Sequence, residues 1–480
     1  MSMQQMLLGL GGVPYEIEYA LRLDGTAYLN RTPPGTGNRK TWTLSWWLKR
    51  GTMDRRMNFG AYTSGPDTAT SEIHDTGQLM WQDWYSGYNY RRLTSKMLAD
   101  PSAWYHIVLA LDTTQGTAGD RCKVFINGEQ QTSFAGSNDP SLNHDGKIGT
   151  NIVHAIGTEG TGVRLEYDGG IAEYHFLDGV AATASAFGKT DPATGQWIPI
   201  EYEGSYGDEG YYLDFSDNSS AAALGYDKSG NSNHWTVTNI ATTDRILDTP
   251  TNNWCTLNPL NEDYANNGTF SECNLKYDST STNHRNTAGT IGMKSGKWYF
   301  EFCNPTLTDG SKSIWAGVVA SDADLTAQRT TGMWHVGASN GRFLVRDGTS
   351  TDFGSAIAAG SVIQAAVDMD NSKLWIGINN TWYGSSSDDT DGNPSTGANP
   401  TDTIAAADIP DGYLYPSAGG YDLEIKFNAG QDSSFSGTKT AQGNTDANGL
   451  GDFYYTPPTG FKALCTANLP TPTIKKGSDH

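Results

Sequence analysis

Two neighbouring stretches decide the fold: WYHIVLAL at residues 104–111 and KVFINGE at residues 123–129. The first stretch carries apolar residues on both of its faces, as expected of a central strand in a sandwich. The second is a strand that runs into Asn127-Gly128, a dipeptide that tolerates positive φ at both central positions of a hairpin turn. The sequence therefore predicts antiparallel β-structure around this point.

The same kind of pattern extends in both directions along the chain. Trp42, Leu44, Trp46 and Leu48 alternate with polar residues, which predicts a half-buried strand. Strand-like stretches continue into the second half of the chain. Glycine is abundant (56 residues) and aromatic residues make up 11% of the chain, whereas no long helical periodicity is present. We therefore predict an all-β protein.

The length of 480 residues calls for more than one domain. The strand pattern breaks at residues 249–253 (TPTNN) and then restarts. We predict two consecutive antiparallel β-sandwiches over residues 15–250 and 251–470. Residues 1–14 are interpreted as an N-terminal peptide and residues 471–480 as a flexible tail.

The charge and the cysteines exclude several classes of function. The formal net charge is −21, which opposes binding to a phosphate backbone, so no nucleic-acid partner is expected. Five widely spaced cysteines with no CxxC pair give no support for a zinc site or a redox motif and exclude a dense disulfide framework, so reduced, buried thiols are expected. No stretch is apolar enough to insert into a membrane.

The two halves resemble two known types of sandwich. The first half, over roughly residues 15–250, resembles a laminin G-like, concanavalin A-type domain. The stretches that carry this resemblance are YLNRT (28–32), TWTLSWWLK (41–49), WYHIV (104–108), VFING (124–128) and GGIAE (169–173). The second half resembles a SPRY domain, which is also a concanavalin-like sandwich. Its stretches are GKWYFE (296–301), WAGV (315–318), VDMD (367–370), KLWIG (373–377), YP (415–416) and LEIKFNAG (423–430).

This pair of modules opens with MSMQQMLLGLGG and closes with YTPPTGFKAL, and the combination is similar to structural proteins of tailed bacteriophages. The resemblance implies a location in the virion, other virion proteins as partners, a homo-oligomer, and a host-surface glycan or protein as ligand. A fibre, spike or tail-associated adhesin is the function we expect. A purely structural capsid or tail decoration protein is the alternative.

Two enzyme motifs come close to matching but are incomplete. Concanavalin-type glycosidases place three acids as ExDxxE on one strand, but residues 166–171 (EYDGGI) end in Ile171, where the general acid is required. Residues 337–341 (GASNG) match GxSxG, but the strand-like FLV at 343–345 follows where a helix is needed. A carbohydrate-active enzyme is therefore the weakest interpretation, and we expect no catalytic residues and no cofactor.

The loop at residues 388–393 (DDTDGN) offers oxygen ligands, but it lacks the Gly and Glu of an EF-hand. A solvated loop is the default interpretation, and an irregular calcium site is the alternative.

An aromatic cluster is the candidate ligand-binding site of the first half. Trp84, Tyr85, Tyr88 and Tyr90 lie in or near a predicted exposed connection between strands at 78–81 and 91–93. Sugar rings stack on exposed aromatic faces because their C–H surfaces are apolar. Packing of the cluster against a neighbouring subunit or domain is the competing interpretation.

The first dozen residues concentrate adaptable apolar side chains in an uncharged segment. These are Met3, Met6, Leu7, Leu8 and Leu10. Methionine suits docking grooves of varied shape, and an exposed apolar segment is rarely without a partner. A frayed terminus is the alternative. We predict an assembly peptide.

Overall fold

The structure is a computed structural model that describes residues 15–64, 67–160, 164–260, 268–279, 285–306, 313–326, 330–339, 341–347, 349–354, 357–386 and 389–470. Within these ranges the regular structure consists of β-strands and short 3₁₀ turns, so the predicted all-β class is confirmed. The chain divides into two compact units between Thr251 and Asn252, and the second unit ends at Leu469. No helix in the described part is long and apolar enough to cross a membrane.

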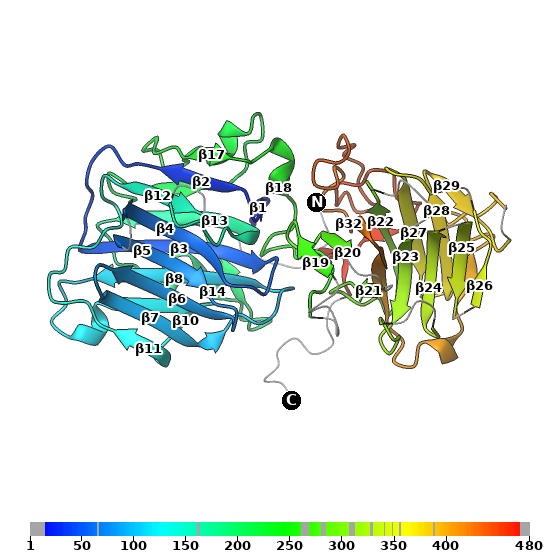
Figure 1. Cartoon of the computed structure of the whole chain (residues 1–480), viewed down its shortest axis with the longest axis horizontal. Helices are drawn as coiled ribbons and strands as arrows, with labels where there is room; N and C mark the ends of the chain where they lie inside the picture. The colour runs from blue at the N-terminus through cyan, green and yellow to red at the C-terminus, as the bar shows by residue number, and fades with distance from the viewer. Residues whose placement is uncertain are drawn as a thin grey trace. The chain divides into compact units, whose positions relative to one another are not determined.

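The first unit is a sandwich of two antiparallel sheets (Figure 1). One sheet has the order β10-β9-β8-β3-β13-β1-β18, with β16 beside β13, and the other has the order β11-β7-β6-β5-β4-β12-β2-β17. The strands are β1 Ala20–Asp24, β2 Tyr28–Arg31, β3 Thr41–Arg50, β4 Arg56–Ser64, β5 Asp67–Ile73, β6 Gln78–Trp84, β7 Tyr88–Met97, β8 Trp104–Asp112, β9 Cys122–Ile126, β10 Glu129–Gln130, β11 Phe134–Asn138, β12 Val153–Ile156, β13 Asp168–Asp178, β14 Gly188–Thr190, β15 Trp197–Pro199, β16 Tyr211–Leu213, β17 Thr236–Thr238 and β18 Arg245–Ile246. The 3₁₀ turns of this unit are Ala118–Asp120, Ala184–Ala186, Ala222–Gly225 and Thr242–Asp244.

The core of the first unit lies between these two sheets, as the alternation in β3 predicts. Trp42, Leu44, Trp46 and Leu48 are all fully buried there. The prediction that β3 is only half-buried is wrong, because its other face is covered as well. The segment after β13 packs on that face: the Thr43 hydroxyl donates a hydrogen bond to the Val180 carbonyl at 2.7 Å.

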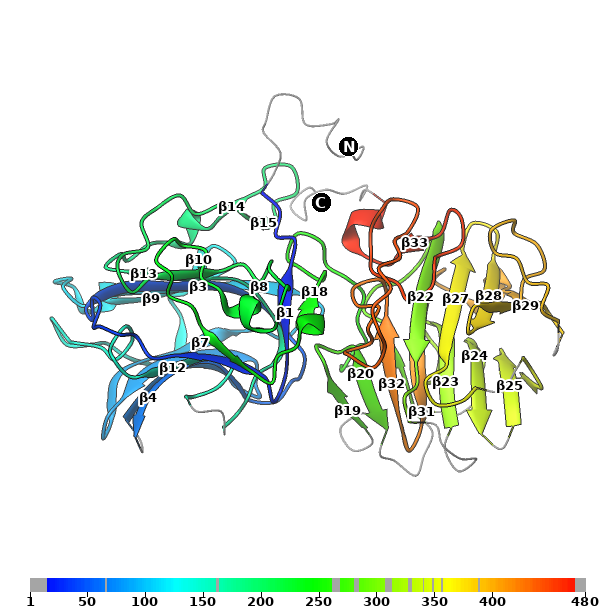
Figure 2. The same ribbon diagram turned by 90° about the horizontal axis from the view of Figure 1, so that it is seen from above.

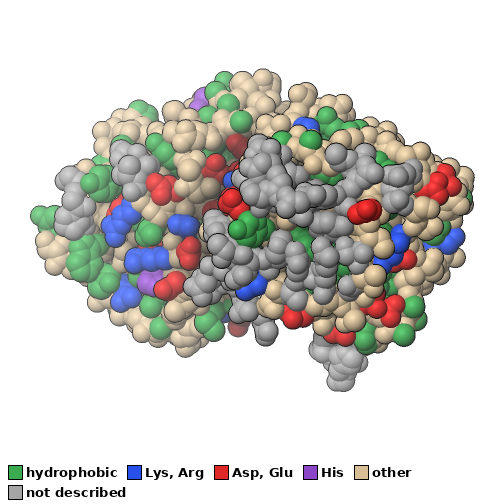
Figure 3. Space-filling model, turned by 45° about the vertical axis from the view of Figure 1, so that its right-hand side comes forward, with side chains coloured by type: hydrophobic (Ala, Val, Ile, Leu, Met, Phe, Trp, Pro, Cys, Tyr) green, Lys and Arg blue, Asp and Glu red, His purple; other side chains and the backbone are tan. Residues whose placement is uncertain are grey.

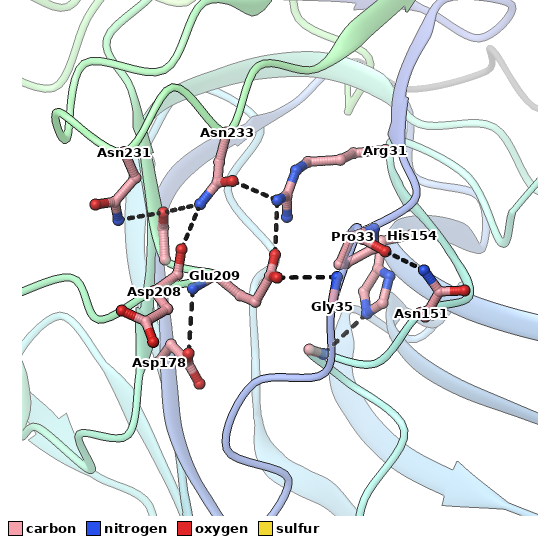
Figure 4. A network of polar contacts seen from close by, with 12 residues as sticks. Arg31, Pro33, Gly35, Asn151, His154, Asp178, Asp208, Glu209, Asn231 and Asn233 are labelled. Atoms are coloured by element: carbon pink, nitrogen blue, oxygen red, sulfur yellow. Dashed lines mark hydrogen bonds and ion pairs between the residues drawn. The ribbon is translucent and has the colours of Figure 1, made fainter.

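A polar network ties several loops of the first unit together (Figure 4). The Arg31 guanidinium donates to Glu209 Oε2 at 2.7 Å and also to the side chain of Asn233. The second oxygen of Glu209 accepts from the Gly35 amide at 3.1 Å, and the Glu209 amide donates to Asp178 Oδ2 at 3.1 Å. Because the Glu209 carboxylate and the Arg31 guanidinium are paired with each other, this network holds these loops in place.

The second unit is also a two-sheet sandwich. One sheet has the order β19-β20-β32-β22-β27-β28-β29, with β30 beside β28 and β33 beside β22; the other has the order β21-β31-β23-β24-β25-β26. The strands are β19 Gly268–Ser271, β20 Lys276–Ser279, β21 Arg285–Ala288, β22 Lys297–Cys303, β23 Ser313–Ala320, β24 Met333–Ser339, β25 Gly341–Arg346, β26 Thr349–Thr351, β27 Val362–Asp368, β28 Lys373–Ile378, β29 Thr381–Tyr383, β30 Asp402–Thr403, β31 Leu414–Tyr421, β32 Leu423–Asn428 and β33 Lys462–Ala463. Its 3₁₀ turns are Ala406–Asp408 and Thr466–Asn468.

A buried carboxylate holds the C-terminal part of the second unit against β22. Glu301 is fully buried and accepts hydrogen bonds from the backbone amides of Tyr454 and Tyr455 at 2.9 and 2.8 Å. The Tyr299 hydroxyl donates to the same side chain at 2.8 Å. Burial raises the pKa of Glu301 to about 7, although these hydrogen bonds lower it in part.

Candidate functional site

The predicted aromatic cluster lies at the tip of the hairpin formed by β6 and β7. The turn consists only of residues 85–87, so both strands extend further than the predicted stretches at 78–81 and 91–93. Ser86 adopts a positive φ of 54°, and the Tyr85 amide donates to the Gly87 carbonyl at 2.9 Å. The tip is thus a tight, hydrogen-bonded turn on a rigid pair of strands.

Three of the four predicted residues gather on the outside of this hairpin. Tyr85 is 64% exposed and Tyr88 is 41% exposed, while Trp84 is partly buried. The ring of Trp84 meets the ring of Tyr88 edge to face, with their centroids 4.6 Å apart. Trp84 and Tyr88 therefore form an aromatic pair, and Tyr85 is exposed at the turn that joins their strands; these three side chains are called the tip surface below.

The fourth residue, Tyr90, does not belong to the tip surface. Its side chain is fully buried in the sandwich core, edge to face with Trp81 at 5.2 Å. In the β6–β7 register Asp83 pairs with Tyr90 and Trp84 pairs with Tyr88, so Asn89 is an extra residue in β7. This bulge places Tyr88 and Tyr90 on opposite faces of the sheet and corrects the prediction that Tyr90 binds ligand.

Cationic side chains lie next to the exposed rings. The Lys147 ammonium lies 6.0 Å from the centroid of the Tyr85 ring, and the Arg91 guanidinium carbon lies 4.9 Å from that of Tyr88. Figure 3 shows Lys and Arg side chains beside hydrophobic ones on the first unit, at the left of the view. Such cations hold the rings in place and add hydrogen-bond donors at the edge of the tip surface.

A buried carboxylate anchors these groups from below. Asp83 is fully buried, and one of its oxygens accepts hydrogen bonds from Lys147 Nζ at 2.8 Å and from Asn89 Nδ2 at 2.7 Å. Lys147 also contacts Asp67 at 2.9 Å. The other oxygen of Asp83 lies 3.8 Å from His144 Nε2, which is beyond hydrogen-bonding distance.

The charge state of this anchor follows from its contacts. Burial alone would raise the pKa of Asp83, but the contacts with His144, Lys147 and Asn89 outweigh burial and lower the pKa below its usual value. The carboxylate therefore stays ionised at neutral pH and keeps Lys147 beside Tyr85. Alternation and composition did not reveal Asp83 as part of the site, and nothing in the sequence links it to Lys147, more than sixty residues away.

The arrangement suits binding and offers no reaction mechanism. An exposed tyrosine face can stack on the apolar face of a sugar ring, while the tyrosine hydroxyls and Lys147 can hydrogen-bond its hydroxyls. The described residues around the tip contain no nucleophile hydrogen-bonded to a base, as nucleophilic catalysis requires.

The two near-matches to enzyme motifs have structural roles. Ile171 is buried in the core, and the backbone at Gly169 passes so close to Lys49 that a Cβ atom would lie 2.2 Å from the Lys49 carbonyl. The GxSxG match lies at the hairpin between β24 and β25, with Ser339 paired to Gly341, so a strand follows it as predicted. His335 in β24 is fully buried, and burial lowers its pKa to about 3.

The other predicted site features divide into those the structure describes and those it does not. All five cysteines are buried thiols, as predicted. Within the described part of the chain, no three or more His, Cys, Asp or Glu side chains are grouped to hold a metal ion. Met3, Met6, Leu7, Leu8 and Leu10 lie outside the described residues, as does Asp388 of the acidic loop.

Comparison with known proteins agrees with this architecture. Residues 23–184 match the concanavalin A-like lectin/glucanases superfamily in its laminin G form. No curated protein matches the chain.

Among solved structures, the laminin α1 chain from mouse (domains LG4-5) is 8% identical, with 95% of this chain and 91% of that chain covered and a TM-score of 0.30. A putative carbohydrate-binding protein from Bacteroides ovatus is 18% identical, with 47% and 60% covered and a TM-score of 0.34. The SPRY domain of human HERC1 is 20% identical, with 32% and 87% covered and a TM-score of 0.23. With the family match and the two-sheet sandwiches together, the chain is an all-β protein whose first unit has a concanavalin A-like, laminin G-type fold.

Proposed function

We propose that this chain is a non-enzymatic binding protein whose first unit recognises a surface glycan through the tip surface of Trp84, Tyr85 and Tyr88. The observation that carries the proposal is the exposure of Tyr85 and Tyr88 on a hairpin anchored by the buried Asp83–Lys147 pair. Large apolar side chains held outward on rigid strands are typical of binding surfaces, because little conformational entropy is lost when a ligand stacks on them.

The first prediction concerns this surface. Replacing both Tyr85 and Tyr88 by alanine should weaken glycan binding by about thirtyfold or more, since central aromatic contacts contribute roughly 2 kcal/mol or more to binding. A glycan array probed with labelled protein, followed by titration of the best ligand, measures the effect.

Tyr226 provides a matched control for this prediction. Its exposed fraction of 42% is close to the 41% of Tyr88, but Tyr226 belongs to a different loop of the same unit. The Tyr226→Ala variant should bind as the unaltered protein does. Equal binding by the Tyr85→Ala/Tyr88→Ala variant and the unaltered protein would rule out the tip surface as the binding site.

The proposed setting is the surface of a tailed-phage particle, where the protein acts as a fibre, spike or tail-associated adhesin. In this setting it forms a homo-oligomer and contacts other virion proteins. Support for this setting comes from the sequence resemblance of the two consecutive modules and of the opening and closing peptides. Within this proposal, the apolar side chains of residues 1–12 contact another virion protein.

A second prediction follows for that peptide. Deleting residues 1–12 should leave the thermal unfolding temperature unchanged within scatter, because the described core of the first unit begins at Ile17. The same deletion should abolish incorporation into particles, measured by immunoblotting of purified virions. Packaging of the truncated chain at the normal level would disprove the assembly role, and a large loss of stability would show that the peptide belongs to the sandwich.

A further inference from the structure

A groove lined by Lys189 of β14 and Ile198 of β15 lies on the first unit. Figure 2 shows the β14–β15 hairpin above the sheet that contains β3, β8 and β13. The groove has a volume of about 590 Å³. Its lining combines two tyrosines, an apolar floor and three charged side chains: Tyr15, Tyr202, Ile198, Lys189, Glu201 and Glu203. This volume lies within the range of about 300–1,000 Å³ that is usual for small-molecule sites.

The wall formed by Tyr15 is fixed by a buried network on β13. The Tyr15 hydroxyl donates to Glu173 Oε2 at 2.9 Å, and the Tyr212 hydroxyl donates to Oε1 at 2.5 Å. The Tyr212 ring stacks on His175 with 4.4 Å between centroids, and His175 contacts Glu173 at 3.3 Å. Glu173 itself is only 7% exposed. Tyr15 is therefore held in a single orientation before any ligand arrives.

The backbone under this network is strained. Glu173 adopts a positive φ of 50°, and the pairing of β13 with β3 shifts register between Ala172 and His175. A bulge of this kind re-aims a side chain, and a non-glycine residue in the left-handed region costs about 1–3 kcal/mol, which surrounding contacts must offset. Such strain is concentrated at functional sites, so it marks Glu173 independently of the groove.

Tyr202 is the second tyrosine that lines the groove. Its ring stacks on Phe187 with 5.1 Å between centroids and 19° between planes, and its hydroxyl donates to the Ser205 carbonyl at 3.0 Å. The Tyr202 side chain is fixed on one side, and it lines the groove.

Burial and the nearby Glu173 raise the pKa of Tyr15, so its hydroxyl stays protonated.

The charges of the groove select the class of ligand. Glu201 and Glu203 oppose an anion, and Lys189 opposes a cation. An uncharged ring with several hydroxyls can hydrogen-bond with all three charged side chains, because carboxylates accept hydrogen bonds from hydroxyls and an ammonium donates hydrogen bonds to them. Its apolar face can then stack on a tyrosine.

We propose that this groove is a second saccharide site, which holds one ring of an uncharged sugar between Tyr15 and Tyr202 with its hydroxyls on Lys189, Glu201 and Glu203. The inference extends the proposed glycan binding but does not depend on the tip surface, since no residue is shared. A glycan that reaches both sites would bind with higher avidity than either site alone provides.

Saturation-transfer NMR on the full chain tests the proposal, with the methyl glycosides of glucose, galactose and N-acetylglucosamine as probes. The measurement is made on the Tyr85→Ala/Tyr88→Ala chain, so that the tip surface cannot contribute. At least one probe should show saturated ring protons. Adding Tyr202→Ala should reduce the signal at least fivefold.

A second variant guards against a loss of folding, because Tyr202 packs on Phe187. Glu201 and Glu203 are exposed, so Glu201→Ala/Glu203→Ala should keep the thermal unfolding temperature and still reduce the signal at least fivefold. Absence of saturation for all three probes, or saturation that neither groove variant changes, would overturn the second site. Neither result bears on the tip surface, whose own variants are tested on the array.

Discussion

Replacing Lys49 by methionine is expected to lower the free energy of unfolding of the first unit by about 3–5 kcal/mol, the usual effect of breaking a buried ion pair. Lys49 in β3 lies 2.7 Å from Asp248, with side-chain exposures of 0% and 2%. The indole of Trp104 donates to the other oxygen of Asp248 at 3.0 Å. Methionine fills most of the volume of lysine, but it leaves the Asp248 carboxylate charged and buried without its cation.

Urea denaturation followed by tryptophan fluorescence measures the loss. The matched control is Lys96→Met, because Lys96 pairs with Glu129 at side-chain exposures of 41% and 69%. Exposed pairs contribute about 0–1 kcal/mol, so this variant should be nearly neutral. The double variant Lys49→Met/Asp248→Leu should recover much of the loss, since no uncompensated charge remains. Equal stability of Lys49→Met and Lys96→Met would show that the buried pair does not stabilise the fold.

Acidification is expected to destabilise the first unit much more than the second. His106 and His154 are buried, and burial lowers their pKa values to about 3 and about 4. A group with a lowered pKa in the folded state contributes stability above its unfolded pKa of 6.5 and loses it as the pH falls. Between pH 6.5 and 4.5 the two histidines together should cost about 5 kcal/mol.

The hydrogen bonds of the two rings explain why they stay neutral. The Trp197 indole N–H donates to His106 Nδ1 at 3.0 Å, and the Gly149 amide donates to His154 Nε2 at 3.0 Å. In each ring, one nitrogen therefore accepts a hydrogen bond from a neighbouring N–H group. Protonation of that nitrogen would place its new N–H against this N–H donor. Neither ring can turn towards solvent to avoid this clash, because both side chains are enclosed by the sandwich and its covering segments.

The second unit contains opposing groups. His335, with its pKa lowered to about 3, loses stability as the pH falls. Glu301, with its pKa raised to about 7, contributes stability below its unfolded pKa of 4.5 and loses it as the pH rises through 7. Between pH 4.5 and 6.5 the two effects have opposite signs and largely cancel.

Hydrogen–deuterium exchange of the full chain at pH 6.5 and pH 4.5, corrected for intrinsic rates, resolves the two units by peptide. Protection should fall in residues 41–50 and 104–112 and change little in 297–303 and 362–368. A uniform loss of protection across both units would contradict this account.

Local patterns in the sequence were enough to predict the strands and the apolar faces that form the core. The alternation of Trp42, Leu44, Trp46 and Leu48 identifies the inner face of β3 correctly. It does not predict that the outer face is buried, because the cover comes from residues that follow β13, far along the chain. Periodicity reports which side chains share a face and carries no information on what packs against it.

The candidate sites show the same limit. The exposure of Tyr85 and Tyr88 could be predicted because both belong to one short hairpin rich in aromatic residues. The burial of Tyr90 could not, since a single extra residue, Asn89, reverses the alternation. The groove is lined by Tyr15 and Tyr202, and Tyr15 is held by Glu173; these residues come from three distant parts of the chain, and no local pattern connects them.

Binding without hydrolysis is the central claim, and one measurement tests both parts of it. Bacterial surface polysaccharide is passed over the immobilised chain, and the eluted material is sized by chromatography. We expect the polysaccharide to be retained with its size distribution unchanged, and the Tyr85→Ala/Tyr88→Ala chain to retain about thirtyfold less at equal loading. Shortened polysaccharide, above all shortening that disappears with Glu166→Gln or Ser339→Ala, or equal retention by the two chains, would contradict this claim.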